Sequence, residues 1–191
     1  MMIKRHLAVD LGAESGRAVA GFLENGKLTL EEIYRFPTAG LFVNGSMRWD
    51  IYRFFLEIKK ALKIYSRTYG SELASIGVDS WGVDFGFLDR RGKLIGIPYH
   101  YRDGRNEGAD KIIDAKIGNR RLYDLTGIQM LPINTLNQLA AMKRDEDPSL
   151  EYGRNIMFIG DLLHYFMTGK AVTEFTAASI SQLYNPFKGD W

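Results

Sequence analysis

The stretch that decides the fold, close to the start of the chain, is Asp10-Leu11-Gly12-Ala13-Glu14-Ser15-Gly16-Arg17, or DLGAESGR. Short apolar runs flank it at residues 7–9 and 18–23, and this pattern predicts two strands joined by a tight hairpin. A glycine-containing turn directs successive backbone N–H groups toward one concave spot that suits phosphate oxygens. The octet therefore predicts a phosphate-binding hairpin; the alternative is an ordinary surface hairpin with mixed charges.

Individual residues of the octet carry chemistry that fits a phosphate. Gly12 and Gly16 are expected to let a phosphate approach where a β-carbon would block it. The Ser15 hydroxyl is a further donor, and Arg17 adds a fixed cation. Asp10, at the end of the first strand, adds a carboxylate that can hold hydrated magnesium.

The composition is that of an ordinary globular domain. The 191 residues are 46% hydrophobic and 25% charged, so the chain can bury a core of its own. The net charge of +2 is spread along the chain without a basic stripe, which argues against nucleic acid as a partner. The sequence contains no cysteine, which excludes disulfides, thiolate zinc sites and a cysteine nucleophile and is compatible with a cytoplasmic location.

A membrane segment and a zinc site are not predicted either. The apolar stretch after His6 is interrupted at Asp10, and no other run is long enough to cross a bilayer. The histidines at positions 6, 100 and 164 lack metal-ligand spacing.

The first part of the chain predicts three strands and a helix. The strands are expected at residues 5–11, 17–23 and 28–36, and Asn25-Gly26 predicts a tight turn that makes the last two antiparallel. A helix is expected to begin at Trp49-Asp50, with Asp50 as its cap, and to end at Gly70. Its core-facing stripe is predicted to be Ile51, Phe54, Phe55, Ile58, Leu62 and Tyr65.

The second part predicts a mixture of strands and helices. Residues 74–79 are expected to form a buried strand, parallel to one already in the sheet because a helix precedes it. Residues 83–88 and 94–97 are expected to form a further hairpin. Helices are predicted near 105–117, 119–125, 135–145 and 161–167, with a last strand at 155–159.

Four ordered motifs resemble the FGGY carbohydrate kinases, a family with the actin and ribonuclease H type of core. They are DLGAESGR, then Ser75 to Phe85 (SIGVDSWGVDF), then Pro98 to Arg105 (PYHYRDGR), then Thr126 to Gln129 with Pro132 to Thr135. The segment from Asn185 to Trp191 adds to the likeness. The resemblance implies an α/β, ribonuclease H-like (actin/hexokinase-type ATPase) fold with a mixed sheet, three antiparallel opening strands and flanking helices. The predicted order of elements agrees with it.

The resemblance also implies an activity, namely phosphorylation of a ketose such as L-rhamnulose by ATP with Mg²⁺ as cofactor. On this basis the N–H groups of Ala13, Glu14, Ser15 and Gly16, the Ser15 hydroxyl and the Arg17 guanidinium would face the β- and γ-phosphates. Asp10 would bind magnesium through water. The partners would be the sugar and ATP.

Residues for the sugar are also implied by the matching motifs. Gly82 would let the sugar lie against bare backbone, and the Asp84 carboxylate would accept its hydroxyl hydrogens. Tyr101, Asp103 and Arg105 would close over the polyol, although a surface ion pair is the alternative for the last two. Asn134 would line the far side of the sugar site; the alternative is that it only caps a helix. Trp81 would cover an apolar part of the sugar or belong to the core.

Kinases of this family have two domains with the active site in the cleft between them. The chain is expected to be the N-terminal domain over residues 1–191, incomplete at its end, because Pro186 to Trp191 reads as a turn that leads onward. A natural terminus is the alternative. The general base and the adenine pocket are expected in the second half, so that this chain alone would be inactive.

Three other functions remain open from the sequence. Another ketose or polyol kinase of the same family, acting on xylulose, fuculose or glycerol, is the nearest. A two-metal nuclease is the second, because the fold can place Asp10 and Asp79 on adjacent strands. A non-catalytic binding or assembly domain is the third.

Overall fold

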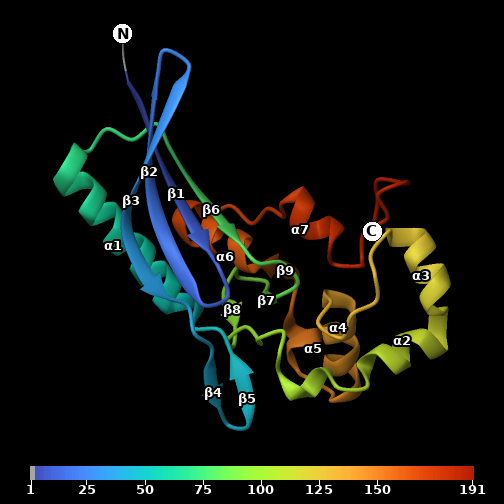
Figure 1. Ribbon diagram of the computed structural model, residues 1–191. Helices are drawn as coiled ribbons and strands as arrows, with labels where there is room; N and C mark the ends of the chain where they lie inside the picture. The colour runs from blue at the N-terminus through green and yellow to red at the C-terminus, as the bar shows by residue number, and fades with distance from the viewer. Residues whose placement is uncertain (1–2) are drawn as a thin grey trace.

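The main sheet of the protein has four strands in the order β3-β2-β1-β6. The computed structural model describes residues 3–191. In it β1 (Lys4–Leu11), β2 (Ser15–Glu24) and β3 (Lys27–Pro37) are antiparallel neighbours, and β6 (Ser75–Ser80) lies parallel to β1 (Figure 1). This confirms the three predicted opening strands and the parallel fourth. Asn25 (φ 53°) and Gly26 (φ 78°) form the predicted turn between β2 and β3.

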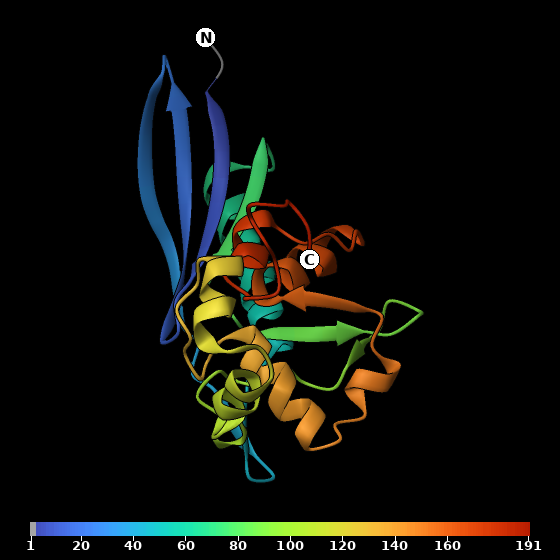
Figure 2. The same cartoon turned by 90° about the vertical axis from the view of Figure 1, so that its right-hand side faces the viewer.

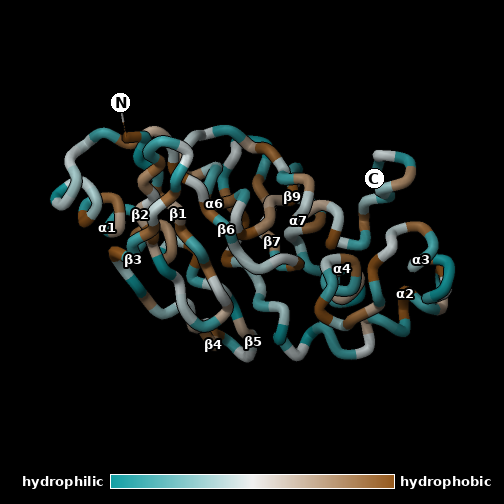
Figure 3. Tube along the Cα trace, turned by 45° about the horizontal axis from the view of Figure 1, so that its top comes forward, coloured by the Kyte–Doolittle hydropathy of each residue, from teal (hydrophilic) through white to brown (hydrophobic). Residues whose placement is uncertain are grey.

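Helix α1 (Ile51–Tyr69) packs against β2 and β3 and closes one face of the sheet. The Asp50 side chain caps it by accepting from the Arg53 N–H at 3.0 Å. Gly70, with φ 85°, ends it. The buried positions are Ile51, Phe54, Ile58, Ala61 and Tyr65, so most of the predicted stripe is confirmed; Phe55 and Leu62 lie half-buried beside it. Apolar and polar positions accordingly alternate along α1 in Figure 3.

The opposite face of the sheet is open within the described residues. In β1, Leu7, Val9 and Leu11 are buried toward α1, whereas Asp10 is half-buried on the other face. Figure 2 shows β1, β2 and β3 rising beyond the helical part of the molecule. The open face therefore leaves polar side chains accessible along its strands.

The prediction that residues 74–79 form a buried strand is wrong. Strand β6 is an edge strand, with Ser75, Gly77 and Asp79 exposed and Ile76 and Val78 half-buried. The reason is that α6 (Ile159–Thr168) covers only one of its faces. The short apolar run reflects that single covered face rather than burial on both.

A second sheet of three strands lies between the main sheet and the helical part (Figure 1). Its central strand β7 (Phe85–Leu88) pairs antiparallel with β8 (Leu94–Ile95) and with β9 (Asn155–Phe158). The predicted hairpin and the predicted last strand are thereby confirmed, with shorter bounds.

The helical part largely follows the prediction. It contains α2 (Ala109–Ile117), α3 (Asn119–Thr126) and α4 (Thr135–Arg144). The expected helix over 105–117 is interrupted at Gly108 (φ 75°), which separates a 3₁₀ turn η1 (Gly104–Asn106) from α2. Within residues 3–191, no helix combines the length and the apolar composition needed to cross a membrane.

Four short elements escaped the sequence analysis. They are the hairpin of β4 (Leu41–Val43) and β5 (Ser46–Arg48), the helix α5 (Ser149–Tyr152) and the helix α7 (Phe175–Ser179). The hairpin has a turn signal in Asn44 and Gly45, both with positive φ.

Candidate functional site

The octet forms the predicted hairpin, with residues 12–14 as its loop. The Gly12 N–H donates to the Ser15 carbonyl at 2.9 Å, and the Thr38 N–H donates to the Glu14 carbonyl at 3.1 Å. Within the described part of the chain, the N–H groups of Ala13 and Glu14 have no hydrogen-bond partner. Two free donors at the tip of a tight turn are suited to an anion.

Charged side chains surround this loop on the open face of the sheet. Asp10 and Arg17 are direct partners across β1 and β2, and an Arg17 Nη atom lies 2.6 Å from Asp10 Oδ2. Arg35 of β3, which the sequence analysis missed, donates to the Ser15 hydroxyl at 3.3 Å and pairs with Glu32. Two guanidinium groups thus flank Ser15.

The donor set near the loop fits a hydrated magnesium ion better than a transition metal. Among residues 3–191, no three His, Cys, Asp or Glu side chains converge as metal ligands. Magnesium needs no such cage, because it keeps several waters and takes one or two carboxylates together with substrate phosphates. The half-exposed carboxylate of Asp10 offers an oxygen of this kind.

The interpretation of Gly16 needs correction. Gly16 is buried, and a β-carbon there would lie 2.5 Å from Phe36 Cζ and 2.8 Å from Leu11 Cδ2. The missing side chain therefore makes room for the core and not for a phosphate. A β-carbon at Gly12 would lie 3.2 Å from the Ser15 carbonyl oxygen, so Gly12 allows the loop to close tightly.

The hairpin loop and the Gly82 segment lie at the same edge of the sheet. Strands β1 and β6 are parallel, with Leu11 opposite Ser80 and Asp10 opposite Asp79. Both strands end at this edge. β1 continues into residues 12–14, and β6 continues into Trp81 and Gly82. The carboxyl ends of parallel strands are where ligands bind in open α/β sheets.

A cavity of about 200 Å³ opens beside this edge, between β6, α6 and α7. Its lining includes Ser80, Gly82, Asp161 and Ile180. A β-carbon at Gly82 would lie 1.9 Å from Ile180 Cδ1, so Ile180 covers the glycine directly. Asp161 is buried, its Oδ2 has no partner within the described residues, and burial raises the pKa of its carboxyl.

Asp84 has a different environment from the one predicted. It is fully buried, and its Oδ2 accepts from the indole N–H of Trp49 at 2.5 Å, from that of Trp81 at 3.0 Å and from the Tyr101 N–H at 3.1 Å. Its Oδ1 accepts from Gln138 Nε2 at 2.7 Å. Burial raises the pKa of Asp84 to about 6, although these hydrogen bonds act in the opposite direction. The carboxylate is occupied by protein donors and is not free to accept from a sugar.

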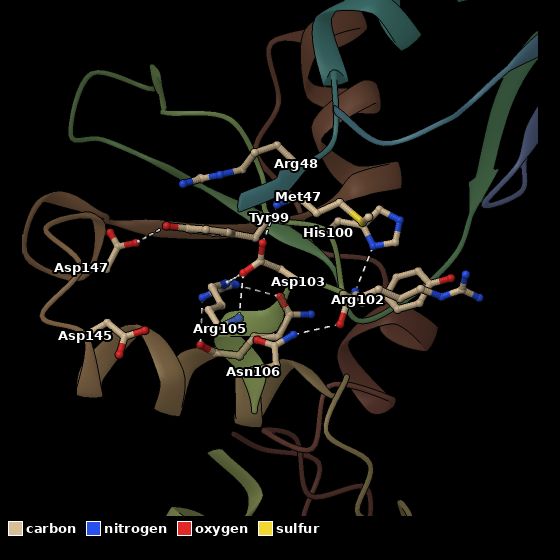
Figure 4. A network of polar contacts seen from close by, with 12 residues as sticks. Met47, Arg48, Tyr99, His100, Arg102, Asp103, Arg105, Asn106, Asp145 and Asp147 are labelled. Atoms are coloured by element: carbon tan, nitrogen blue, oxygen red, sulfur yellow. Dashed lines mark hydrogen bonds and ion pairs between the residues drawn. The ribbon is translucent and has the colours of Figure 1, made fainter. Parts of the chain in front are cut away.

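Asp103 and Arg105 are likewise engaged within the protein (Figure 4). Asp103 accepts from the Met47 N–H at 2.5 Å and from the Arg105 N–H at 3.0 Å. The Arg105 guanidinium lies 3.6 Å from the Tyr99 ring centroid and donates to Gln138 Oε1 at 3.0 Å. Burial lowers the pKa of Arg105. Asp103 and Arg105 therefore form neither an exposed ion pair nor a pair of side chains with polar groups free to bind a sugar.

Tyr101 and Asn134 complete the residues that the sequence suggested for the sugar. Tyr101 is half-buried next to Trp49 and His100, and its phenol is not tied into the Asp84 network. Asn134 is the residue before α4, but its side chain does not cap the helix; its Nδ2 donates to the Gln129 carbonyl at 2.8 Å.

The sequence analysis also missed the side chains that surround Asp84. Trp49 was assigned only as a helix start and Gln138 only to a helix, whereas Thr135 was part of the fourth motif but was not connected with Asp84. Each contacts the segment 83–84 across a long sequence separation, and no local pattern announces such a pairing.

Comparisons with known proteins agree with this architecture. The N-terminal domain of the FGGY family of carbohydrate kinases matches residues 5–191, and the chain belongs to this family. It is 44% identical over 184 residues to a rhamnulokinase of Bacteroides thetaiotaomicron, covering 96% of the chain and 38% of that protein. It is 42% identical over 187 residues to a rhamnulokinase of Yersinia pestis, covering 97% and 38%. The chain thus spans well under half the length of these relatives.

Solved structures show the same fold at low sequence identity. A ligand-bound xylulose kinase of Lactobacillus acidophilus superposes with a TM-score of 0.86 at 17% identity, covering 98% of this chain and 38% of that one. A glycerol kinase of Plasmodium falciparum with ADP superposes with a TM-score of 0.74 at 15% identity, covering 99% and 39%. The predicted sugar-kinase fold, of the ribonuclease H-like type, is confirmed.

Proposed function

We propose that this chain supplies the phosphate loop and part of the sugar site of an ATP-dependent kinase, with L-rhamnulose as substrate. The observation that carries the proposal is that the hairpin loop 12–14 and Gly82 lie at the same edge of two adjacent parallel strands. Transfer of a phosphoryl group needs the two reactants held side by side more than it needs covalent help. The similarity to rhamnulokinases at 39–44% identity supports the choice of sugar.

The phosphates of ATP would lie against the hairpin. The free N–H groups of Ala13 and Glu14 would donate to phosphate oxygens, together with the Ser15 hydroxyl. Arg17 would leave its pairing with Asp10 and neutralise charge on the transferring group. Asp10 would then hold Mg²⁺ through water, and the metal when bound would neutralise the phosphate oxygens.

The sugar would lie against the backbone of Gly82 and beside the Tyr101 ring. Asp84, Asp103, Arg105 and Asn134 would act differently from the sequence-based prediction, because their polar groups bond to other parts of the protein. They would hold in place the loops that contact the sugar. Ile180, which covers Gly82, would have to move aside for the sugar.

The activity of the whole protein would need more than this chain. Among the carboxylates near the proposed site, Asp10 is assigned to the metal and Asp84 is bonded to protein donors. Asp161 is buried beside Gly82 and accepts from the Glu174 N–H, so we do not assign it as the general base for the attacking hydroxyl. We place the base and the adenine pocket in the part of the relatives that this chain does not span. The enzyme would work in the cytoplasm, where ATP and magnesium are supplied.

A coupled ADP assay on a protein of the relatives' full length that carries this sequence tests the proposal. The assay compares L-rhamnulose with L-fuculose, D-xylulose and glycerol at saturating MgATP. The expected result is the highest kcat/KM for L-rhamnulose. A higher value for another sugar would reassign the substrate, and no turnover of any sugar would contradict the kinase function. The 191-residue chain alone is expected to show no sugar-dependent ADP release.

A nuclease with two metals has less support. Asp10 and Asp79 are indeed direct neighbours on β1 and β6. However, Asp10 is paired with Arg17 of β2, and a cation already next to this carboxylate opposes the binding of two further cations.

A further inference from the structure

The segment Gly82-Val83-Asp84 forms a strained turn. The Asp84 N–H donates to the Gly82 carbonyl at 2.9 Å, which closes a three-residue γ-turn. Its central residue Val83 has φ 68°. Positive φ is unfavourable for a β-branched residue, and a γ-turn of this hand is rare and strained. Such a conformation persists only where surrounding contacts determine it.

Two helix side chains hold the carbonyl of Val83. The Thr135 hydroxyl donates to it at 2.8 Å, and Gln138 Nε2 lies 3.3 Å from it. Both residues are buried at the start of α4. The peptide at the strained position is thus fixed from the side of α4.

The carboxylate of Asp84 fixes the other end of the turn. Trp49 and Trp81 donate to it from positions before α1 and after β6, and the N–H of Tyr101 donates from the following loop. Gln138 donates to its second oxygen, so a single amide contacts both Val83 and Asp84. A buried carboxylate with donors from four segments is a rigid anchor.

Gln138 also connects the turn to the loop at residues 99–105. Its Oε1 accepts from Arg105, whose guanidinium stacks on Tyr99. The same side chain therefore touches the two segments that the proposed sugar site needs. Loss of its amide would remove one contact from each segment.

We infer that Asp84 and Gln138 are positioning residues that hold the Gly82–Asp84 turn in its strained form and thereby fix the Gly82 backbone that faces the sugar. This inference rests on the proposed function. It assigns to Asp84 the role of aiming the sugar-binding backbone in place of the direct sugar contact that the sequence suggested.

The test uses Asp84→Asn, Gln138→Met and Val83→Gly in the full-length protein that carries this sequence. Glycine adopts positive φ without strain, so Val83→Gly should make the anchoring contacts less necessary. An asparagine cannot accept at its amide nitrogen, and methionine cannot donate. We expect Asp84→Asn and Gln138→Met each to raise the KM for the sugar about tenfold or more, the size associated with a buried unpaired polar group. The KM for ATP should change little.

The double variant Val83→Gly/Asp84→Asn decides between positioning and general stability. We expect it to recover most of the sugar KM. Asp89→Asn, which removes a carboxylate that accepts from the Arg91 and Lys93 N–H groups at the other end of β7, is the matched control and should leave the sugar KM unchanged. A rise in the KM for ATP equal to that for sugar, without recovery in the double variant, would overturn the inference.

Tryptophan emission separates this inference from the proposed function. Because Trp49 and Trp81 both donate to the Asp84 carboxylate, Asp84→Asn should shift the emission. If the wild-type protein phosphorylates no sugar, the proposed function fails, whereas a shifted emission in Asp84→Asn would still support the role of Asp84 as the anchor of the turn. An emission that Asp84→Asn leaves unchanged would overturn it.

Discussion

The hairpin of β1 and β2 and the network around Asp84 are built in opposite ways. The hairpin is exposed, and its ion pair joins Asp10 and Arg17, which are 7 residues apart in the sequence. The network is buried, and its bonds join Asp84 to Trp49 and Gln138, at separations of 35 and 54 residues. The hairpin keeps donors free for a ligand, whereas the network uses its polar groups to fix backbone. Substitutions in the hairpin should therefore change chemistry with little effect on the fold, and substitutions around the network should change geometry.

The largest effect is expected from Gly82→Arg in the full-length protein. The side chain would displace Ile180, which covers Gly82, and enter the proposed sugar site, so kcat/KM for the sugar should fall by about 100-fold or more, since each tenfold loss needs only about 1.4 kcal/mol. Steady-state kinetics measure this. Ile180→Ala is the control, because it removes the covering side chain without filling the site. Unchanged kinetics in Gly82→Arg would place Gly82 outside the site.

Arg17→Ala is expected to have the next largest effect. If Arg17 neutralises the transferring group, turnover should fall about 100-fold, the usual loss when one donor to developing charge is removed, with a smaller change in the KM for ATP. Arg17→Lys should recover only part of it, because an ammonium cannot reproduce a guanidinium fork. Thermal unfolding of both variants serves as the check on the fold. A loss confined to ATP affinity would contradict this role.

His100 supplies a pH-dependent test of the buried region. It stacks on Trp49 at a centroid distance of 4.0 Å, and burial, helped by Arg102, lowers its pKa to about 4. A histidine with a lowered pKa contributes stability that is complete above its unfolded pKa of about 6.5 and is lost as the pH falls toward 4. His100→Phe should therefore reduce the loss of unfolding free energy between pH 7 and pH 4.5 by about 1–2 kcal/mol. Urea unfolding at the two pH values measures it.

The burial of Asp84 has the opposite effect on the pH dependence of the unfolding free energy over part of the range between pH 7 and pH 4.5. Its pKa is raised to about 6, so its protonation stabilises the folded state as the pH falls from 6 toward 4. An identical pH dependence in wild type and His100→Phe would show that His100 is accessible to protons in the folded protein.

The smallest effect is expected from Glu14→Ala. Glu14 is exposed at the tip of the hairpin, and its backbone N–H, which the substitution retains, is the group assigned to phosphate. The unfolding free energy should change by less than about 0.5 kcal/mol and turnover by less than about threefold. Chemical denaturation and the ADP assay measure both. A loss as large as that of Arg17→Ala would mean that the Glu14 side chain takes part in binding.

The sequence predicted the elements whose signals are local. The Asn25-Gly26 turn, the Asp50 cap and the apolar stripe of α1 each need only neighbouring residues; the turn and the cap are confirmed, and so is most of the stripe. The edge position of β6 could not be predicted in this way, because it depends on which strands add to the sheet.

In the candidate site, too, the residues with local sequence signals were predicted and those brought together by the fold were not. The hairpin residues were found because glycine, serine and charged residues in a short turn have a recognisable pattern. Trp49 and Gln138 were missed because only the folded chain brings them to Asp84. Gly16 was misinterpreted because a glycine that makes room for a core side chain looks the same in sequence as one that makes room for a ligand.

The most direct test of the central claim is amide NMR of the full-length protein, selectively labelled at alanine and glycine. The claim is that sugar and phosphate meet at the shared edge of β1 and β6. Addition of L-rhamnulose should shift the Gly82 resonance, and addition of MgATP should shift that of Ala13. If L-rhamnulose leaves Gly82 unchanged and MgATP leaves Ala13 unchanged while both ligands bind, the site lies elsewhere and the account is wrong.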